Sequence, residues 1–308
     1  MASGGYSMYF PIADVTVSPV LLMVVGFLVG ILGGFFGVGG GFLAGPMMFW
    51  AGVPMNFVVG TDLAHMTGKS IVAARRHRAL GHVDLKLGAF MILGTILGVE
   101  IGARIIEALQ RSGTLDISIG VVYIFILVII SGFTAWESIR AIQMVRTDQI
   151  AVEDAVGFKG LARRIQSVRI PPMVSFPVSG IESISIWMVL GVGFLTGLLA
   201  GSLGVGGGFI RMPMLVYILG VPTHVAVGTD LFEIVFSSGF GTITHAIKGN
   251  VDILMALVMQ TGAAIGAQIG ATATRFFAGP RIRLAFSFLP LIGAVLVLVR
   301  LFSSGTLH

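Results

Sequence analysis

The chain has 308 residues, of which 56% are hydrophobic and only 11% are charged, and its formal net charge is +5. This composition excludes an ordinary soluble domain and predicts an all-α polytopic membrane protein. The absence of cysteine excludes disulfides, thiol chemistry and cysteine-ligated metal sites. The positive charge does not indicate nucleic-acid binding, because the basic residues lie in loops where membrane topology accounts for them.

The first half of the chain opens with a long uncharged run over residues 15–61. A span needs about 20 apolar residues, so this run must fold back within the membrane. No basic segment precedes it, and residues 19–34 are therefore expected to be a retained span rather than a signal peptide. Helical segments are predicted at about 19–36, 41–52, 55–79, 83–109 and 114–140. The short second segment, between glycines and Pro46, is predicted to be a broken or re-entrant helix.

The central segment, residues 141–183, is the only sizeable polar stretch. It divides the chain into a first membrane repeat (1–140), a basic linker and a second membrane repeat (184–308). Apolar residues recur at near-helical spacing beside basic ones between Phe158 and Val168, which suggests a short helix on an anionic membrane face. An ordinary basic linker that serves topology is the alternative.

The second half repeats the first. Helical segments are predicted at about 184–203, 208–220, 222–247, 251–276 and 282–302. Gly37-Val38-Gly39-Gly40-Gly41-Phe42 returns as Gly204-Val205-Gly206-Gly207-Gly208-Phe209, and Gly60-Thr61-Asp62-Leu63 returns as Gly228-Thr229-Asp230-Leu231. The offset is 167 at first and 168 after one inserted residue. Such an internal duplication is typical of secondary transporters.

Arginine and lysine predict the orientation. The central segment is basic, and basic loops mark the cytoplasm, so it is placed inside together with Arg75, Arg76 and Arg78. Because each half has an odd number of segments, five, the second copy has the opposite orientation in the membrane. This orientation also places Arg281 inside. We therefore predict an inverted repeat with both termini outside, although Lys248 then lies on the outer side.

The glycine loops are the first candidate site. A helix that begins after such a loop presents free N–H groups and about half an elementary positive charge, and two of them could converge on one oxyanion. The alternative is that the glycines only permit close helix packing. The predicted contacts are Gly39, Gly40, Gly41, Phe42, Gly206, Gly207, Gly208 and Phe209.

Ionisable residues within spans form the second candidate site, because burying charge there is costly and usually functional. Asp62, His65 and Lys69 share one helical face, and their repeat partners are Asp230, Glu233 and Ser237. Arg211 stands where the first half has Ala44. The predicted anion contacts are Thr61, Lys69, Arg211 and Thr229, and the predicted proton or coupling residues are Asp62, His65, Glu100, Asp230 and Glu233.

These residues also have structural interpretations that involve no ligand. The Thr-Asp pairs could be N-caps of interrupted helices, and Lys69 could pair with Asp62 or reach toward the cytoplasmic end. Glu100 could hydrogen-bond between helices. His77 and His245 are expected to be interface residues rather than ligands.

These motifs resemble one known family. The doubled Gly-Val-Gly-Gly-Gly-Phe with its following proline, the doubled Gly-Thr-Asp-Leu and the two-half layout are similar to the sulfite exporter TauE/SafE family. The resemblance covers nearly the whole chain except the central segment. It implies a multi-pass transporter in the cell (inner) membrane that moves sulfite, organosulfonates or related sulfur oxyanions. No cofactor is predicted.

Three classes of function stay open. A secondary transporter, exporting its anion, explains the repeat, the broken helices and the unequal polar residues together. A passive anion channel has less need of the carboxylates, which repel anions, and a proton-coupled uptake permease would use them. An intramembrane enzyme has no supporting metal motif such as His-Glu-x-x-His, so no catalytic or metal-binding residue is predicted.

Overall fold

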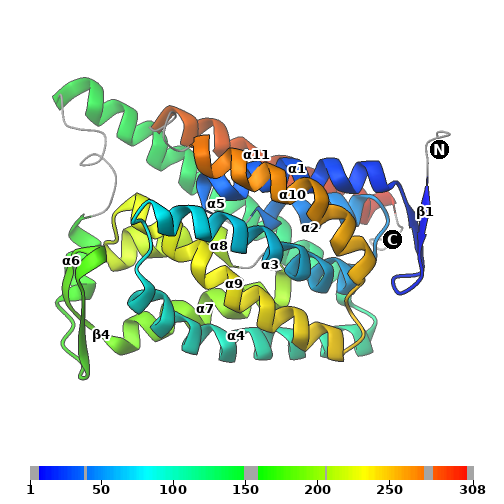
Figure 1. Ribbon diagram of the computed structural model, residues 1–308, viewed down its shortest axis with the longest axis horizontal. Coiled ribbons are helices and arrows are strands. Elements are labelled where there is room, and N and C mark those ends of the chain that lie inside the picture. Colours follow the sequence, from blue (N-terminus) through cyan, green and yellow to red (C-terminus); the bar gives the residue numbers. More distant parts are fainter. Residues whose placement is uncertain (1–6, 38–39, 149–158, 205–206, 274–279, 304–308) are drawn as a thin grey trace.

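The protein is a bundle of helices that lie mostly along one long axis (Figure 1). The computed structural model describes residues 7–37, 40–148, 159–204, 207–273 and 280–303. Within these ranges, 5 helices are long and apolar enough to cross a membrane: α1 (Pro19–Phe36), α4 (Leu85–Ser112), Leu115–Arg140 of α5 (Leu115–Asp148), α7 (Ile186–Leu203) and α10 (Ile253–Ala273). These helices are consistent with the predicted all-α multi-pass membrane protein.

The other helices also follow the predicted order. In the first half, α2 (Gly41–Trp50) follows α1, and α3 (Met55–Ala79) precedes α4. In the second half, α8 (Gly208–Pro213) continues into a π-helical turn, η2 (Met214–Leu219), and is followed by α9 (Thr223–Ile247), α10 and α11 (Pro280–Ser303). A ten-residue α-helix is only about 15 Å long, so α2 is too short to cross a bilayer.

Local signals explain where the helices begin and end. Ser18 caps α1 by accepting a hydrogen bond from Leu21 N, and Gly37 ends the helix in the left-handed region with φ 75°. Asp84 and Asp252 cap α4 and α10 in the same way, accepting from Leu87 N and Met255 N at 2.9 and 3.0 Å. Each half therefore uses equivalent residues as boundary signals.

Two short hairpins were not predicted. β1 (Met8–Phe10) pairs with β2 (Val15–Val17) before α1, and β3 (Met173–Phe176) pairs with β4 (Ile181–Ser185) before α7. The two hairpins occupy equivalent places in the two halves, and they lie at opposite ends of the bundle (Figure 1).

The predicted helix of the central segment is present as α6 (Lys159–Gln166). It packs against protein, because Ala162 is buried and Gln166 Nε2 donates to the carbonyl of Leu219 at 2.8 Å. Its placement on an anionic membrane face stays a prediction.

The halves pack across each other rather than side by side. α1 of the first half packs on α10 of the second, and α4 packs on α7, while α3 and α9 lie in the middle (Figure 1). Glycines line both crossings: a Cβ on Gly26 would lie 2.0 Å from the carbonyl oxygen of Met259, and one on Gly94 would lie 2.2 Å from that of Leu190. Backbones this close need glycine at the contact.

Candidate functional site

Both helix breaks are built from left-handed glycines. Gly37 and Gly204 end α1 and α7, and Gly40 and Gly207 precede α2 and α8, with φ between 73° and 75° at all four. Only glycine adopts this conformation without strain. The intervening Gly39 and Gly206, both predicted anion contacts, lie outside the described residues.

The glycines at the breaks are also required by packing. A Cβ on Gly40 would lie 2.6 Å from the carbonyl oxygen of Val29, and one on Gly207 would lie 2.6 Å from that of Thr196. The predicted packing role is thus supported directly, and a side chain at either position would disturb the fold. Contact of these loops with an anion stays a prediction.

The residues that begin the short helices lie inside the protein. Gly41 accepts a hydrogen bond from Tyr123 Oη at 3.0 Å, and Phe42 and Gly208 are buried. Phe209 lies in the first turn of α8. The described starts of both short helices are therefore shielded from lipid.

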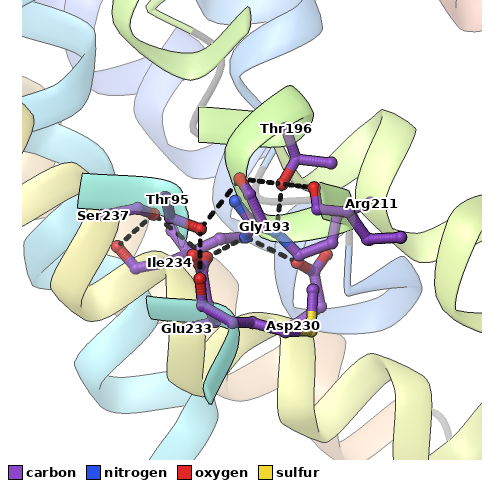
Figure 2. Close-up of polar contacts among 10 residues, drawn as sticks. Thr95, Gly193, Thr196, Arg211, Asp230, Glu233, Ile234 and Ser237 are labelled. Atoms are coloured by element: carbon purple, nitrogen blue, oxygen red, sulfur yellow. Dashed lines mark hydrogen bonds and ion pairs between the residues drawn. The ribbon is translucent and has the colours of Figure 1, made fainter. Parts of the chain in front are cut away.

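The second-half polar residues form one compact ion-pair cluster (Figure 2). The guanidinium of Arg211, on α8, donates from Nη1 to Asp230 Oδ1 at 2.9 Å and forms an ion pair with Glu233. Its Nε donates to Thr196 Oγ1 at 3.1 Å. Ser237 donates to Glu233 at 3.1 Å, and all of these side chains are fully buried. One guanidinium is thus shared by two carboxylates from α9.

The first-half polar residues lie on one face of α3 and are paired differently. His65 Nδ1 lies 3.0 Å from Asp62 Oδ1, and both side chains are buried. Lys69 is 2% exposed, and its Nζ has no hydrogen-bond partner in the described part of the chain. The same holds for His65 Nε2 and Asp62 Oδ2. The ion pair between Lys69 and Asp62, which the sequence allowed as an alternative, is therefore not formed.

The two clusters differ because the duplicated positions have diverged. Ala44 and Val29 stand in the first half where the second half has Arg211 and Thr196. Thr196 was not singled out from the sequence, although its difference from Val29 was the available signal. The first half therefore keeps an aspartate at the repeated position without the arginine that neutralises it in the second.

Thr61 and Thr229 do not cap helices, because α3 and α9 run through both positions without interruption. The N-cap interpretation is wrong. Their hydroxyls instead accept hydrogen bonds across the halves, Thr61 from Asp252 N at 3.0 Å and Thr229 from Asp84 N at 2.9 Å. The caps of α10 and α4 are therefore tied to the middle of α3 and α9.

The structure separates Glu100 from both clusters. Its side chain is 34% exposed and accepts from Arg104 Nε at 2.8 Å, one helical turn along α4. No contact between Glu100 and either buried cluster therefore supports the coupling role predicted for this residue.

The two histidines near span ends are buried rather than interfacial. His77 Nε2 lies 3.3 Å from the carbonyl of Gly34, and His245 Nε2 lies 2.9 Å from that of Gly201. These carbonyls belong to the last turns of α1 and α7, where a helix has no internal donor left for them. The interface interpretation is wrong, and the histidines satisfy the broken helix ends.

The described residues contain no group of three or more His, Cys, Asp or Glu side chains arranged to hold a metal ion.

The family model described as "Sulfite exporter TauE/SafE" matches residues 22–297. The "Probable membrane transporter protein YunE" of Bacillus subtilis is 29% identical over 264 residues, which cover 83% of this chain and 88% of that protein. The "Probable membrane transporter protein MJ0441" of Methanocaldococcus jannaschii is 26% identical, over 81% of this chain and 84% of that protein.

A plant relative carries the family's name. The "Sulfite exporter TauE/SafE family protein 5" of Arabidopsis thaliana is 27% identical over 137 residues, 43% of this chain and 29% of that protein. No solved structure matches the chain significantly.

Proposed function

Because the chain belongs to the sulfite exporter TauE/SafE family of membrane transporters, we propose that it moves sulfite, an organosulfonate or a related sulfur oxyanion across the cell (inner) membrane by alternating access. The observation that carries this proposal is the pair of helix breaks, each with a buried charged cluster on the neighbouring long helix. Discontinuous helices with buried charge are how secondary transporters build a substrate site at membrane depth.

An inverted repeat is part of the proposal. The equivalent hairpins at opposite ends of the bundle support it (Figure 1). So do the reciprocal bonds in which Thr61 accepts from Asp252 and Thr229 accepts from Asp84, because a two-fold axis generates each from the other. Two halves related in this way can rock against each other around a fixed site, which is the motion that alternating access needs.

We place the central segment in the cytoplasm. Arg75, Arg76 and Arg78 lie in the last turns of α3, and this helix leads into α4, whose cap Asp84 accepts from Ser179 Oγ beside β4 at 2.7 Å. The basic end of α3 and the β3–β4 hairpin therefore share one end of the bundle. An excess of arginine and lysine marks the cytoplasmic side of a membrane protein.

Export is the direction that we favour. An inside-negative potential drives a monovalent anion outward by about 2.3 kcal/mol per 100 mV, so export needs no coupled ion. The buried carboxylates argue against a passive channel, because fixed negative charge in a pore repels anions.

The proposal is tested by flux in proteoliposomes. The purified chain should carry sulfite, thiosulfate or isethionate with saturation at high concentration and with counterflow against the same unlabelled anion. Arg104→Gln is the matched control, since it removes a cation that is 71% exposed and should leave the flux unchanged. Flux that rises linearly with concentration would indicate a channel, and no flux of any of these anions would overturn the proposal.

A further inference from the structure

We propose that the two halves are unequal in function: the anion binds at Lys69 and His65 in the first half, whereas Arg211 in the second half serves a structural ion-pair cluster. This inference rests on the proposed anion transport and names the site that performs it. The sequence treated Lys69 and Arg211 as equivalent candidates, and their surroundings distinguish them.

The first argument is the state of the Lys69 ammonium. A buried ammonium in a membrane bundle is costly and is normally paired. Lys69 is 2% exposed, yet the described residues supply its Nζ with no hydrogen-bond partner. A bound oxyanion would supply the missing hydrogen bonds.

His65 offers a second unpartnered group on the same face of α3. Its Nδ1 is engaged by Asp62, which fixes the ring and leaves the buried Nε2 without a partner among the described residues. Nε2 can accept a hydrogen bond from a protonated oxyanion when the ring is neutral and can donate one when the ring is charged. Lys69 and His65 together suit a small oxyanion with several acceptor oxygens.

The second half is chemically unsuited to the same role. Arg211 already contacts Asp230, Glu233 and Thr196 (Figure 2). Two carboxylates face one guanidinium, so the formal charge of this cluster leaves no positive excess for an anion. Ser237 stands where the first half has Lys69, and it donates to Glu233.

Gln260 of α10 ties the proposed site to the other half of the chain. With its amide oriented to satisfy both groups, its nitrogen donates to the carbonyl of His65 at 2.9 Å and its oxygen accepts from the backbone of Lys69 at 3.2 Å. Gly68 gives it room, since a Cβ there would lie 2.7 Å from the Gln260 side chain. The equivalent first-half residue is Ile92, so this contact exists only at the proposed site. Gln260 is a positioning residue.

The experiment measures sulfite binding to the purified full-length chain. Lys69→Gln should weaken binding by about tenfold or more, which corresponds to about 1.4 kcal/mol, with little change in unfolding temperature. The matched variant Arg211→Met/Asp230→Asn/Glu233→Gln removes every charge from the second cluster and should bind sulfite as the wild type does. The opposite ranking of these two variants would overturn the assignment.

A chemical rescue keeps the test decisive if Lys69→Gln does not fold. The chain contains no cysteine, so Lys69→Cys provides a unique thiol. Aminoethylation of that thiol restores a cation of nearly the same length and should restore sulfite binding, whereas a neutral methylthio group should not. Equal binding after both treatments would also overturn the assignment. Failure of the wild type to bind any sulfur oxyanion would instead reject the proposed function.

Discussion

At the scale of single residues, the same amino-acid type has different energetic roles in the two halves. Asp62 is paired with a histidine, whereas Asp230 is paired with an arginine that also contacts Glu233. Removing one partner of a buried ion pair leaves a charge uncompensated, which costs far more than replacing the whole group.

The arginine cluster gives the first residue-scale prediction. Arg211→Gln leaves two buried carboxylates without a cation and should destabilise the protein by about 3–5 kcal/mol. Glu233→Gln leaves one carboxylate for one guanidinium and should cause little loss. Thermal unfolding in detergent measures both. A larger loss from Glu233→Gln than from Arg211→Gln would show that the cluster is not organised by charge.

The cross-half threonines give the second prediction. Thr61→Val and Thr229→Val each leave a buried backbone N–H without its acceptor, so each should cost about 1–3 kcal/mol of stability with unchanged sulfite affinity. Thr67→Val is the control, because among the described residues its hydroxyl donates to a carbonyl of its own helix, that of Leu63. A selective loss of affinity in Thr61→Val would return this residue to the anion site.

Residue pairing is where sequence reasoning failed. Thr61 and Asp62 have the composition of a helix cap, and nothing near them in the chain shows that the threonine serves Asp252 in the other half. Likewise, Arg211 could balance either a ligand or a carboxylate, and its ion pairs with Asp230 and Glu233 become visible only in the structure. These contacts are long-range, so local patterns carry no information about them.

At the scale of helices, the sequence was highly informative. The predicted bounds of 19–36 and 55–79 coincide with α1 and α3. The reason is that uncharged runs, prolines and doubled glycines fix where a membrane helix can begin and end. The β1–β2 hairpin was missed because a long-range contact holds it. Ala13, in the turn of this hairpin, donates from its backbone N to Asp252 Oδ2 in the other half at 3.1 Å.

The helix crossings give an element-scale prediction. Gly94→Ala places a methyl group 2.2 Å from the carbonyl oxygen of Leu190, so α4 and α7 must move apart and the unfolding temperature should fall. Gly191→Ala on α7 meets nothing within 4 Å and should be neutral or stabilising by up to about 1 kcal/mol. Equal effects of the two variants on thermal unfolding would contradict the crossing.

At the scale of the whole molecule, the proposed topology places the two hairpins on opposite sides of the membrane. Single cysteines are clean probes because the chain has none. Ile12→Cys, in the β1–β2 turn, should react with an impermeant maleimide added outside intact cells. Val178→Cys, beside β4, should react only after lysis. Both positions are about half exposed, at 52% each, so accessibility does not bias the comparison. Labelling of both from one side would refute the inverted arrangement.

The crossed packing of the halves also bears on how such a molecule could have arisen. Helices α7 and α10 are the repeat copies of α1 and α4, so the α1–α10 and α4–α7 crossings are the same contact made twice. A contact in which each copy offers its first helix to the other's fourth is an isologous interface, the kind that closes a two-fold homodimer. A single ancestral half, inserted into the membrane in both orientations, could therefore have assembled the same bundle before gene fusion. Fusion would then have freed the copies to diverge, and one now has an arginine where the other has alanine.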